Sequence, residues 1–378
     1  MQIKQLNLFV TVFSCVFMVF RAAAFETYGK QIILYDMSTD TVLLEKNADM
    51  PMAPSSMSKI MTIYKVFEKL KDGDLSLNDK FKVSEKAWRK GGSKMFVKLN
   101  SRVKVEDLIR GVIVQSGNDA TIVIAEGLSG TEEFFADELN KTAKELGMLN
   151  SHFTNASGWP DPNHQTTARD LTKLAISTIQ DFPEFYHYYE EKTFTFNNIR
   201  QNNRNPALFK DLGADGLKTG YTKAGGYGVT VSAVKGDRRL VLVINGLKSR
   251  RLRTNETERV LDWGFRNFRN YKLFDAGETV ADGAVWMGDE DKIPLITEKK
   301  IVMTLSRKQR RNMKVKVLLS TPIPAPVSKG LRLGSLQIDI PGRKPLIHPI
   351  VSAGSVAKLS FLSKLKVTVK YLLWGELK

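Results

Sequence analysis

Three short motifs, far apart in the chain, constrain this sequence more than any other feature. They are Ser56-Met57-Ser58-Lys59, Ser116-Gly117-Asn118 and Lys218-Thr219-Gly220, in that order. Each motif alone is weak, because Ser-x-x-Lys arises by chance in any lysine-rich protein. Together they imply a serine nucleophile that is activated by a lysine, with no histidine and no metal ion in the reaction.

The first motif is predicted to lie at the start of a helix. Apolar, β-prone runs at residues 31–37 and 41–44 precede it and indicate a hairpin. After Pro54 the pattern changes, and apolar residues recur at helical spacing: Ile60, Ile63, Phe67 and Leu70. Ser56 therefore begins this helix, and Lys59 follows one turn later on the same face.

The second motif is predicted at a break between helices. The segment Glu106–Gln115 is amphipathic, Ser116-Gly117-Asn118 interrupts it, and another apolar run follows at residues 120–125. Ser129-Gly130-Thr131-Glu132 is typical of a capping box that opens a further helix, which ends near Gly147.

The third motif is predicted on or beside a strand. Residues 225–234 and 239–245 are β-like, and Lys235-Gly236-Asp237 between them is a good hairpin turn. Lys218-Thr219-Gly220 lies just before this hairpin. Helices that are bracketed by early and late strands indicate an α/β (α+β) domain, which we expect over residues 25–270.

From Tyr271 onward the sequence predicts a second, smaller domain. Short alternating runs at 301–305, 314–319 and 335–340 are separated by turns that contain proline and glycine. This pattern is typical of an all-β, sandwich-like domain, which we expect over residues 271–355. A chain of 378 residues is long enough for both domains.

Residues 356–378 predict an amphipathic helix that lies on a membrane. Its apolar residues follow helical spacing: Leu362, Leu365, Val369, Leu372 and Leu373. Lysines occupy the other faces: Lys358, Lys364, Lys366 and Lys370. With Trp374 as an interfacial aromatic residue, the segment suits the plane of an anionic membrane. The alternative is a helix that packs on the β domain.

Residues 1–24 are similar to a secretory signal peptide. Lys4 gives a basic start, residues 6–20 are apolar, and Ala22-Ala23-Ala24 offers small residues for cleavage before Phe25. The alternative is an uncleaved membrane anchor, but the apolar run is short and Arg21 interrupts it.

Removal of this segment would change the cysteine content and the charge of the chain. The only cysteine, Cys15, would be lost, so neither disulfides nor a thiol nucleophile are expected; lipidation at Cys15 is rejected because bulky Phe13 precedes it. Loss of Lys4 and Arg21 would lower the net charge from +17 to +15. A positively charged surface of this kind suits acidic lipid, nucleic acid or an anionic polymer as a partner, and a secretory signal disfavours nucleic acid.

The sequence contains no metal-ligand spacing and no phosphate-binding glycine loop, so neither a metal nor a cofactor is predicted.

Activation of the serine hydroxyl requires a lysine whose amine is neutral. Lys59 accepts the proton of Ser56 only if the pKa of its ammonium group falls, and burial or a second cation lowers that pKa. Lys218 is the natural second cation. Ser116 is expected to pass a proton to the leaving amine, and Asn118 to orient either the substrate or Lys59.

The sequence resembles active-serine, penicillin-interacting enzymes, and specifically the low-molecular-mass penicillin-binding proteins of the D-alanyl-D-alanine carboxypeptidase family (serine peptidase S11). The resemblance covers nearly the whole chain. Besides the motifs, four segments carry it: Glu45–Ala48, Ile199–Asn205, Asp215–Gly220 and Arg251–Glu256. It implies a serine β-lactamase/transpeptidase-like first domain, followed by the β domain and the amphipathic helix.

The resemblance also implies the roles of individual residues. Ser56 would be the acyl nucleophile, Lys59 the base and Ser116 the proton relay. The substrate-binding residues would be Asn118, Lys218, Thr219, Gly220, Tyr221 and Arg253, with Arg253 on the terminal carboxylate.

Three further residues near the motifs need an interpretation. Tyr221 stands where the family usually has a smaller residue or histidine; its N–H would join that of Ser56 in an oxyanion hole, and its ring would narrow the site. His164 is interpreted as structural or at the rim of the site, because Lys59 already serves as base. Ser55 lies four residues from Lys59 and does not fit the motif.

The function that the resemblance implies is that of a periplasmic D,D-carboxypeptidase, peripherally attached to the inner membrane. It would remove the terminal D-alanine from peptidoglycan pentapeptide stems through an acyl-enzyme on Ser56, in cell wall biogenesis and the control of cell shape. Stem peptides, inhibitory β-lactams and anionic lipid are the expected partners, and the sequence carries no signal for an oligomeric state.

Three alternatives remain at this stage. A D,D-endopeptidase performs the same chemistry on cross-linked stems. A class A-like β-lactamase shares the three motifs but deacylates with a glutamate-held water, and the stretch 153–170 contains no glutamate. A non-enzymatic, wall-binding scaffold would not need to retain all the residues of the motif set.

Overall fold

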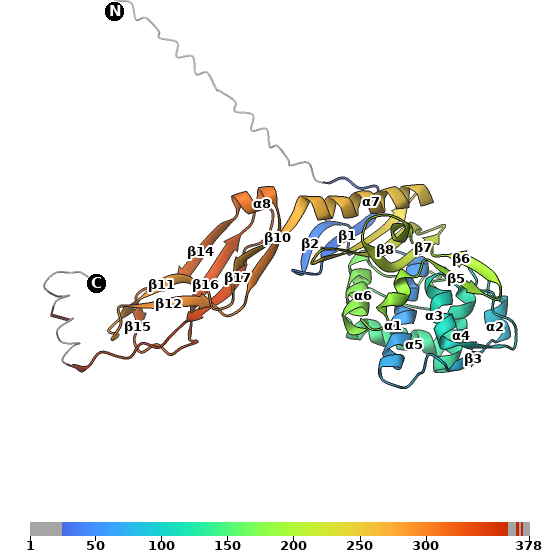
Figure 1. Cartoon of the computed structure of the whole chain (residues 1–378), viewed down its shortest axis with the longest axis horizontal. Helices are drawn as coiled ribbons and strands as arrows, with labels where there is room; N and C mark the ends of the chain where they lie inside the picture. Colours follow the sequence, from blue (N-terminus) through green and yellow to red (C-terminus); the bar gives the residue numbers. More distant parts are fainter. Residues whose placement is uncertain (1–24, 362–367, 370–371, 373–378) are drawn as a thin grey trace, which may run out of the picture.

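The computed structural model describes residues 25–361, 368–369 and 372 (Figure 1). The proposed signal segment and most of the predicted amphipathic helix lie outside the described residues. The described part forms two units, an α/β domain and a β domain, which are joined through one long helix (Figure 1).

The first domain is built on a five-stranded antiparallel sheet with the order β2-β1-β9-β8-β7. Its strands are β1 (Gln31–Asp36), β2 (Thr41–Lys46), β7 (Ala214–Thr222), β8 (Gly226–Lys235) and β9 (Arg238–Leu247). The early hairpin pairs with the late one, and Ile32 lies opposite Ile244. Both predicted hairpins are therefore confirmed, and they form the centre of one sheet.

Alternation along these strands produces two apolar cores, one on each face of the sheet. Ile33 and Val243 contribute to the larger core, whereas Ile32 and Ile244 contribute to the smaller one. The larger core packs against six helices: α1 (Lys59–Lys71), α2 (Glu85–Arg89), α3 (Val105–Ile113), α4 (Asn118–Ser129), α5 (Glu132–Glu145) and α6 (Ala168–Asp181). The smaller core is covered by α7 (Arg250–Asn267) (Figure 1).

Short elements complete the first domain. Two small two-stranded sheets flank the helical layer: β3 (Lys80–Lys82) with β4 (Arg102–Lys104), and the hairpin of β5 (Thr193–Phe196) with β6 (Ile199–Asn202). The 3-10 helices are η1 (Ser55–Ser58), η2 (Tyr186–Glu190) and η3 (Pro206–Phe209). The helix predicted after Pro54 thus begins with a 3-10 turn and becomes α-helical at Lys59.

One predicted helix start is wrong. The capping box was expected to begin at Ser129, but Ser129 is the last residue of α4, and its hydroxyl donates to Glu138 Oε1 at 2.8 Å. The N-cap of α5 is Thr131, whose Oγ1 accepts the Phe134 N–H at 3.1 Å. Gly130, with φ of +79°, separates the two helices and moves the cap two residues further on.

The second domain is all-β and sandwich-like, as predicted. Strand β10 (Phe268–Phe274) follows α7 directly and pairs with β13 (Ile301–Ser306). A six-stranded sheet has the order β14-β16-β17-β12-β11-β15. Its strands are β11 (Thr279–Trp286), β12 (Lys292–Thr297), β14 (Lys314–Leu319), β15 (Ile323–Pro324), β16 (Arg332–Asp339) and β17 (Leu346–Ser352), and the short helix α8 spans Arg307–Asn312. The two sheets share one core, to which Leu305 and Leu336 contribute.

A buried ion pair ties the two domains at their junction. Arg238 at the start of β9 donates from Nε and Nη2 to Asp36 Oδ2, at 2.9 and 2.7 Å. Its Nη1 also donates to the Phe268 carbonyl, at 2.7 Å, where β10 begins. Among the residues that the structure describes, no helix is long and apolar enough to cross a membrane.

Candidate active site

The centre of the site is the buried ammonium group of Lys59. Its side chain is fully buried, and Nζ donates to Ser56 Oγ at 2.9 Å, to Asn118 Oδ1 at 2.8 Å and to the Ser157 carbonyl at 2.6 Å. These partners come from η1, from the start of α4 and from the loop after α5. The Ser-x-x-Lys spacing therefore places the nucleophile candidate and the base candidate within hydrogen-bond distance.

Burial is the main reason that Lys59 is suited to accept a proton. Desolvation lowers the pKa of its ammonium group to about 7, and the nearby guanidinium of Arg204 contributes to this decrease. A substantial fraction of the amine is then neutral near neutral pH. Sequence reasoning did not assign this role to Arg204, although the residue lies in the segment 199–205 that carries the family resemblance.

Lys218 lies on β7 and is also buried, with 2% of its surface exposed. Burial lowers the pKa of Lys218 well below its usual value, and repulsion from Lys59 adds to this effect. The cations that lower the pKa of Lys59 itself are Arg204 and Lys90, so the second cation that was expected at Lys218 is supplied here by other residues. Arg204 belongs to the same cationic group, because it also lowers the pKa of Lys218.

The second motif adopts a strained turn between α3 and α4. Ser116 is buried with φ of +59°, and Asn118 begins α4. The amide of Asn118 accepts from Lys59 through Oδ1 and donates through Nδ2 to the Gly91 carbonyl at 2.9 Å. Of the two roles expected for Asn118, this geometry favours orientation of Lys59.

Asp119 fixes the loop beside this turn, and sequence reasoning did not identify it. Its buried carboxylate accepts the backbone N–H groups of Met95, Phe96 and Val97, at 2.9, 2.9 and 3.2 Å. A carboxylate with several N–H donors is well stabilised in a buried position. The segment 95–97 is thereby held against the start of α4.

The third motif lies on the edge strand β7, which packs directly against η1. A Cβ atom at Gly220 would lie 2.9 Å from the Pro54 carbonyl oxygen and 3.0 Å from Ser55 Cβ, so only glycine allows this approach. Tyr221 follows with 55% of its surface exposed, and its ring stacks on Tyr227 with the centroids 4.3 Å apart.

Arg253 lies in the first turns of α7 and is buried, with 5% of its surface exposed. Its Nη1 donates only weakly to the Gly228 carbonyl, at 3.5 Å, and its Nε has no hydrogen-bond partner among the described residues. Burial lowers the pKa of the guanidinium to about 10. A buried guanidinium with donors to spare is suited to bind a carboxylate.

Most of these residues line one cavity of about 860 Å³, which we call the catalytic cavity; Lys59 and Lys218 are buried behind its wall and are not among the lining residues. Ser56, Ser116, Asn118, Thr219, Gly220, Tyr221 and Arg253 all contribute to its wall. Four cations, Arg204, Lys223, Arg250 and Arg253, also line it, whereas no acidic side chain among the described residues does. The cavity therefore favours an anionic substrate.

The other polar side chains near Ser56 have structural bonds. Ser55 Oγ donates to Thr222 Oγ1 at 3.1 Å. His164 Nδ1 accepts the Thr154 N–H at 3.1 Å, so that its Nε2 carries the proton donated to Ser58 Oγ at 2.8 Å. Burial lowers the pKa of His164 to about 4, which keeps the imidazole neutral. The interpretation of His164 as structural agrees with this geometry.

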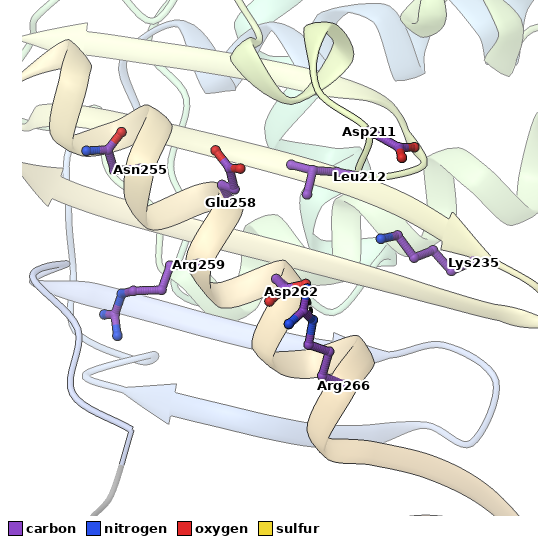
Figure 2. Close-up of a pocket in the computed structure, with 8 residues that line it drawn as sticks. All are labelled: Asp211, Leu212, Lys235, Asn255, Glu258, Arg259, Asp262 and Arg266. Atoms are coloured by element: carbon purple, nitrogen blue, oxygen red, sulfur yellow. Dashed lines mark ion pairs between the residues drawn. The ribbon is translucent and has the colours of Figure 1, made fainter.

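A different cavity, of about 530 Å³, lies along the outer face of α7 and contains none of the motif residues (Figure 2). One ion pair joins two of its lining side chains, Arg266 and Asp262, at 2.7 Å. Two further lining residues pair with neighbours outside the cavity wall: Glu258 with Lys210 at 3.3 Å, and Arg259 with Glu256 at 2.9 Å. The lysine that lines this cavity, Lys235, is exposed to solvent, so it does not resemble the buried amine of Lys59.

Comparisons with known proteins agree with this geometry. The profile of the family D-alanyl-D-alanine carboxypeptidase (peptidase S11) matches residues 18–249, and that of the penicillin-binding protein 5 C-terminal domain matches residues 268–358. The chain is 38% identical to D-alanyl-D-alanine carboxypeptidase DacC of Escherichia coli (strain K12) over 352 residues, which cover 90% of this chain and 88% of that protein.

Two solved structures are similar over most of the chain. Penicillin binding protein 5 from Haemophilus influenzae has a TM-score of 0.74 at 34% identity, covering 88% of this chain and 98% of that one. The D-alanyl-D-alanine carboxypeptidase DacD from Francisella tularensis has a TM-score of 0.79 at 30% identity, covering 90% and 96%.

The lowered pKa of Lys59 predicts how acylation depends on pH. The rate of penicillin acylation should rise by about tenfold per pH unit below a midpoint near pH 7, because only the neutral amine accepts a proton. Arg204→Ala removes a repelling cation, so the pKa of Lys59 rises and the midpoint should move to higher pH. Stopped-flow acylation between pH 5 and 9 measures this shift.

Arg200→Ala is the matched control, because Arg200 is an exposed arginine on β6, four residues before Arg204. It should leave the midpoint unchanged. Equal midpoints for the wild type and Arg204→Ala would contradict the role assigned to Arg204.

Proposed function

The chain belongs to the peptidase S11 family of D-alanyl-D-alanine carboxypeptidases, and on this basis we propose which residues of the site carry out each step of its reaction. The protein is a serine-type D-alanyl-D-alanine carboxypeptidase of the penicillin-binding protein 5 type. Its substrate is the pentapeptide stem of peptidoglycan, from which it releases the terminal D-alanine. β-Lactams acylate the same serine.

Acylation begins at Ser56. Lys59 takes the proton from Ser56 Oγ, which attacks the carbonyl carbon of the penultimate D-alanine. The backbone N–H groups of Ser56 and Tyr221 stabilise the oxyanion, and Ser116 passes a proton to the leaving amine. Terminal D-alanine departs, and water then hydrolyses the ester. The observation that carries this proposal is the 2.9 Å hydrogen bond between the buried Lys59 amine and Ser56.

The free carboxylate of the terminal D-alanine binds to the cationic side of the cavity. Arg253 supplies the guanidinium, and Thr219 and Lys218 of β7 assist it. The buried, incompletely bonded guanidinium supports this assignment. The relatives that match over about 90% of the chain are named carboxypeptidases, whereas the endopeptidase relative matches over 58%, which favours the carboxypeptidase over the endopeptidase alternative.

The other two alternatives are less well supported. The loop that contributes Ser157 and Gly158 to the catalytic cavity belongs to the stretch 153–170, which contains no glutamate for the deacylation of a class A-like β-lactamase. A scaffold without activity would have no use for a neutral lysine that is bonded to a serine hydroxyl.

The nucleophile is tested with two neighbouring serines. Ser56→Ala should abolish both labelling by fluorescent penicillin and release of D-alanine from a pentapeptide. Ser55→Ala is the matched control and should remain labelled, because the Ser55 hydroxyl bonds to Thr222 rather than to Lys59. Labelling that survives the first change and disappears with the second would refute the assignment.

The carboxylate site is tested at Arg253. Arg253→Ala should lower kcat/KM for a D-Ala-D-Ala peptide by about 100-fold, because a charge-assisted bidentate contact is lost. The rate of acylation by penicillin should fall by a smaller factor than kcat/KM for the peptide. Arg251→Ala, an exposed neighbour on the same helix, serves as the control. Unchanged peptide kinetics in Arg253→Ala would remove this residue from the site.

We also propose that the enzyme acts in the periplasm, with residues 1–24 as its signal peptide and residues 356–378 as a peripheral anchor on the inner membrane. Apolar burial and attraction of lysines to anionic lipid support such an anchor, at about 1 kcal/mol per lysine. Its remaining partners are the stem peptides and β-lactams already named.

The anchor is tested by truncation. Mature protein that ends at Ala357 should stay in solution when full-length mature protein pellets with anionic vesicles, and pelleting of the latter should weaken as salt rises. The truncated protein should still cleave small D-Ala-D-Ala peptides, because all motif residues precede the tail. Equal pelleting of both proteins would favour a helix packed on the β domain.

A further inference from the structure

A second cavity, of about 320 Å³, lies directly beside the catalytic cavity. Most of its wall is apolar: Ala53, Pro54, Trp159, Pro160, Pro162 and Ala224. No lysine or arginine among the described residues lines it. Asp161, the acidic residue in its wall, accepts the Asn163 N–H at 2.8 Å within a turn. The chemistry of this cavity therefore differs from that of its cationic neighbour.

The two cavities share a wall. Gly158, Trp159, Pro160 and Thr222 line both of them. The backbone of Trp159 is held by the side chain of Asn155, whose Oδ1 accepts the backbone N–H at 2.9 Å and whose Nδ2 donates to the backbone carbonyl at 3.1 Å. Lys90 Nζ lies 4.5 Å from the centroid of its ring. The side chain of Trp159 therefore lies at the boundary between the two cavities, and a ligand in one can extend past it into the other.

The position of the charges indicates which part of the substrate reaches the second cavity. The leaving D-alanine carries the carboxylate, which belongs on the cationic side. The second cavity borders the residues just before the nucleophile, including Pro54, the last residue of β7, Thr222, and Ala224 in the turn that follows β7. Since β7 is an edge strand, an extended acyl group that pairs with its free edge continues past Thr222 toward Ala224.

We propose that this second cavity is an apolar subsite, which receives an aliphatic or aromatic group on the acyl side of the scissile bond, N-terminal to D-Ala-D-Ala. The inference rests on the proposed carboxypeptidase function and deepens it by naming a substrate preference. Burial of such a group between Trp159 and the prolines removes apolar surface from water and strengthens binding of the acyl portion.

The test compares peptides that differ only in their acyl group: acetyl-, hexanoyl- and phenylacetyl-D-Ala-D-Ala. In the wild type, kcat/KM for the two larger peptides should exceed that for the acetyl peptide by about tenfold. Ala224→Trp places an indole in the second cavity from an exposed position, so this ratio should fall toward one. Ala276→Trp, the same exchange at an exposed turn of the β domain, should keep the ratio of the wild type.

Folding of each variant is checked by thermal unfolding, and Ala224→Leu replaces Ala224→Trp if the larger side chain prevents folding. Equal kcat/KM for all three peptides in the wild type, or an unchanged ratio in the folded Ala224 variant, overturns the subsite while the carboxypeptidase assignment stands. If the wild type releases D-alanine from none of the peptides, or Ser56→Ala still releases it, the proposed function fails and the subsite fails with it.

Discussion

The burial of one ammonium group without a paired carboxylate determines the organisation of this site. Removing Lys59 from water is costly, and the cost is offset by hydrogen bonds to Ser56, Asn118 and Ser157. These partners come from three separate segments, so each segment has to stay in place for the bonds to form. Asn118 is in turn anchored on Gly91. Because the buried amine needs all three hydrogen bonds, it fixes the relative positions of η1, the start of α4 and the loop after α5.

The same concentration of positive charge serves two purposes. Repulsion among Lys59, Lys218 and Arg204 favours the neutral form of a lysine, which a base requires. The cations that line the cavity also attract a carboxylate, which the terminal D-alanine carries. An acidic residue in this wall would raise the pKa of Lys59 and compete for Arg253. The composition of the wall therefore satisfies both requirements, because it contains cations and no acidic side chain among the described residues.

Sequence patterns predicted the elements that have strong periodicity or a characteristic turn. The hairpins, the helix after Pro54 and the strands of the β domain belong to this group. The start of α5 was misplaced, because both Ser129 and Thr131 are good caps and the turn at Gly130 decides between them. The carbonyl of Ser157 could not be identified, since a backbone acceptor has no sequence signature. Arg204 carried no assigned role because only the β5–β6 hairpin brings it near Lys59.

Helix α7 links the chemistry to the second domain. Its first turns place Arg253 in the catalytic cavity, and its last residue, Asn267, leads directly into β10. Eighteen residues of helix span about 27 Å, so the β domain begins well away from the cavity (Figure 1). The buried pair of Arg238 and Asp36, with its bond to Phe268, holds the end of this helix against the central sheet. The proposed membrane segment follows the β domain. In the anchoring proposed above, the β domain would lie between the cavity and the lipid surface.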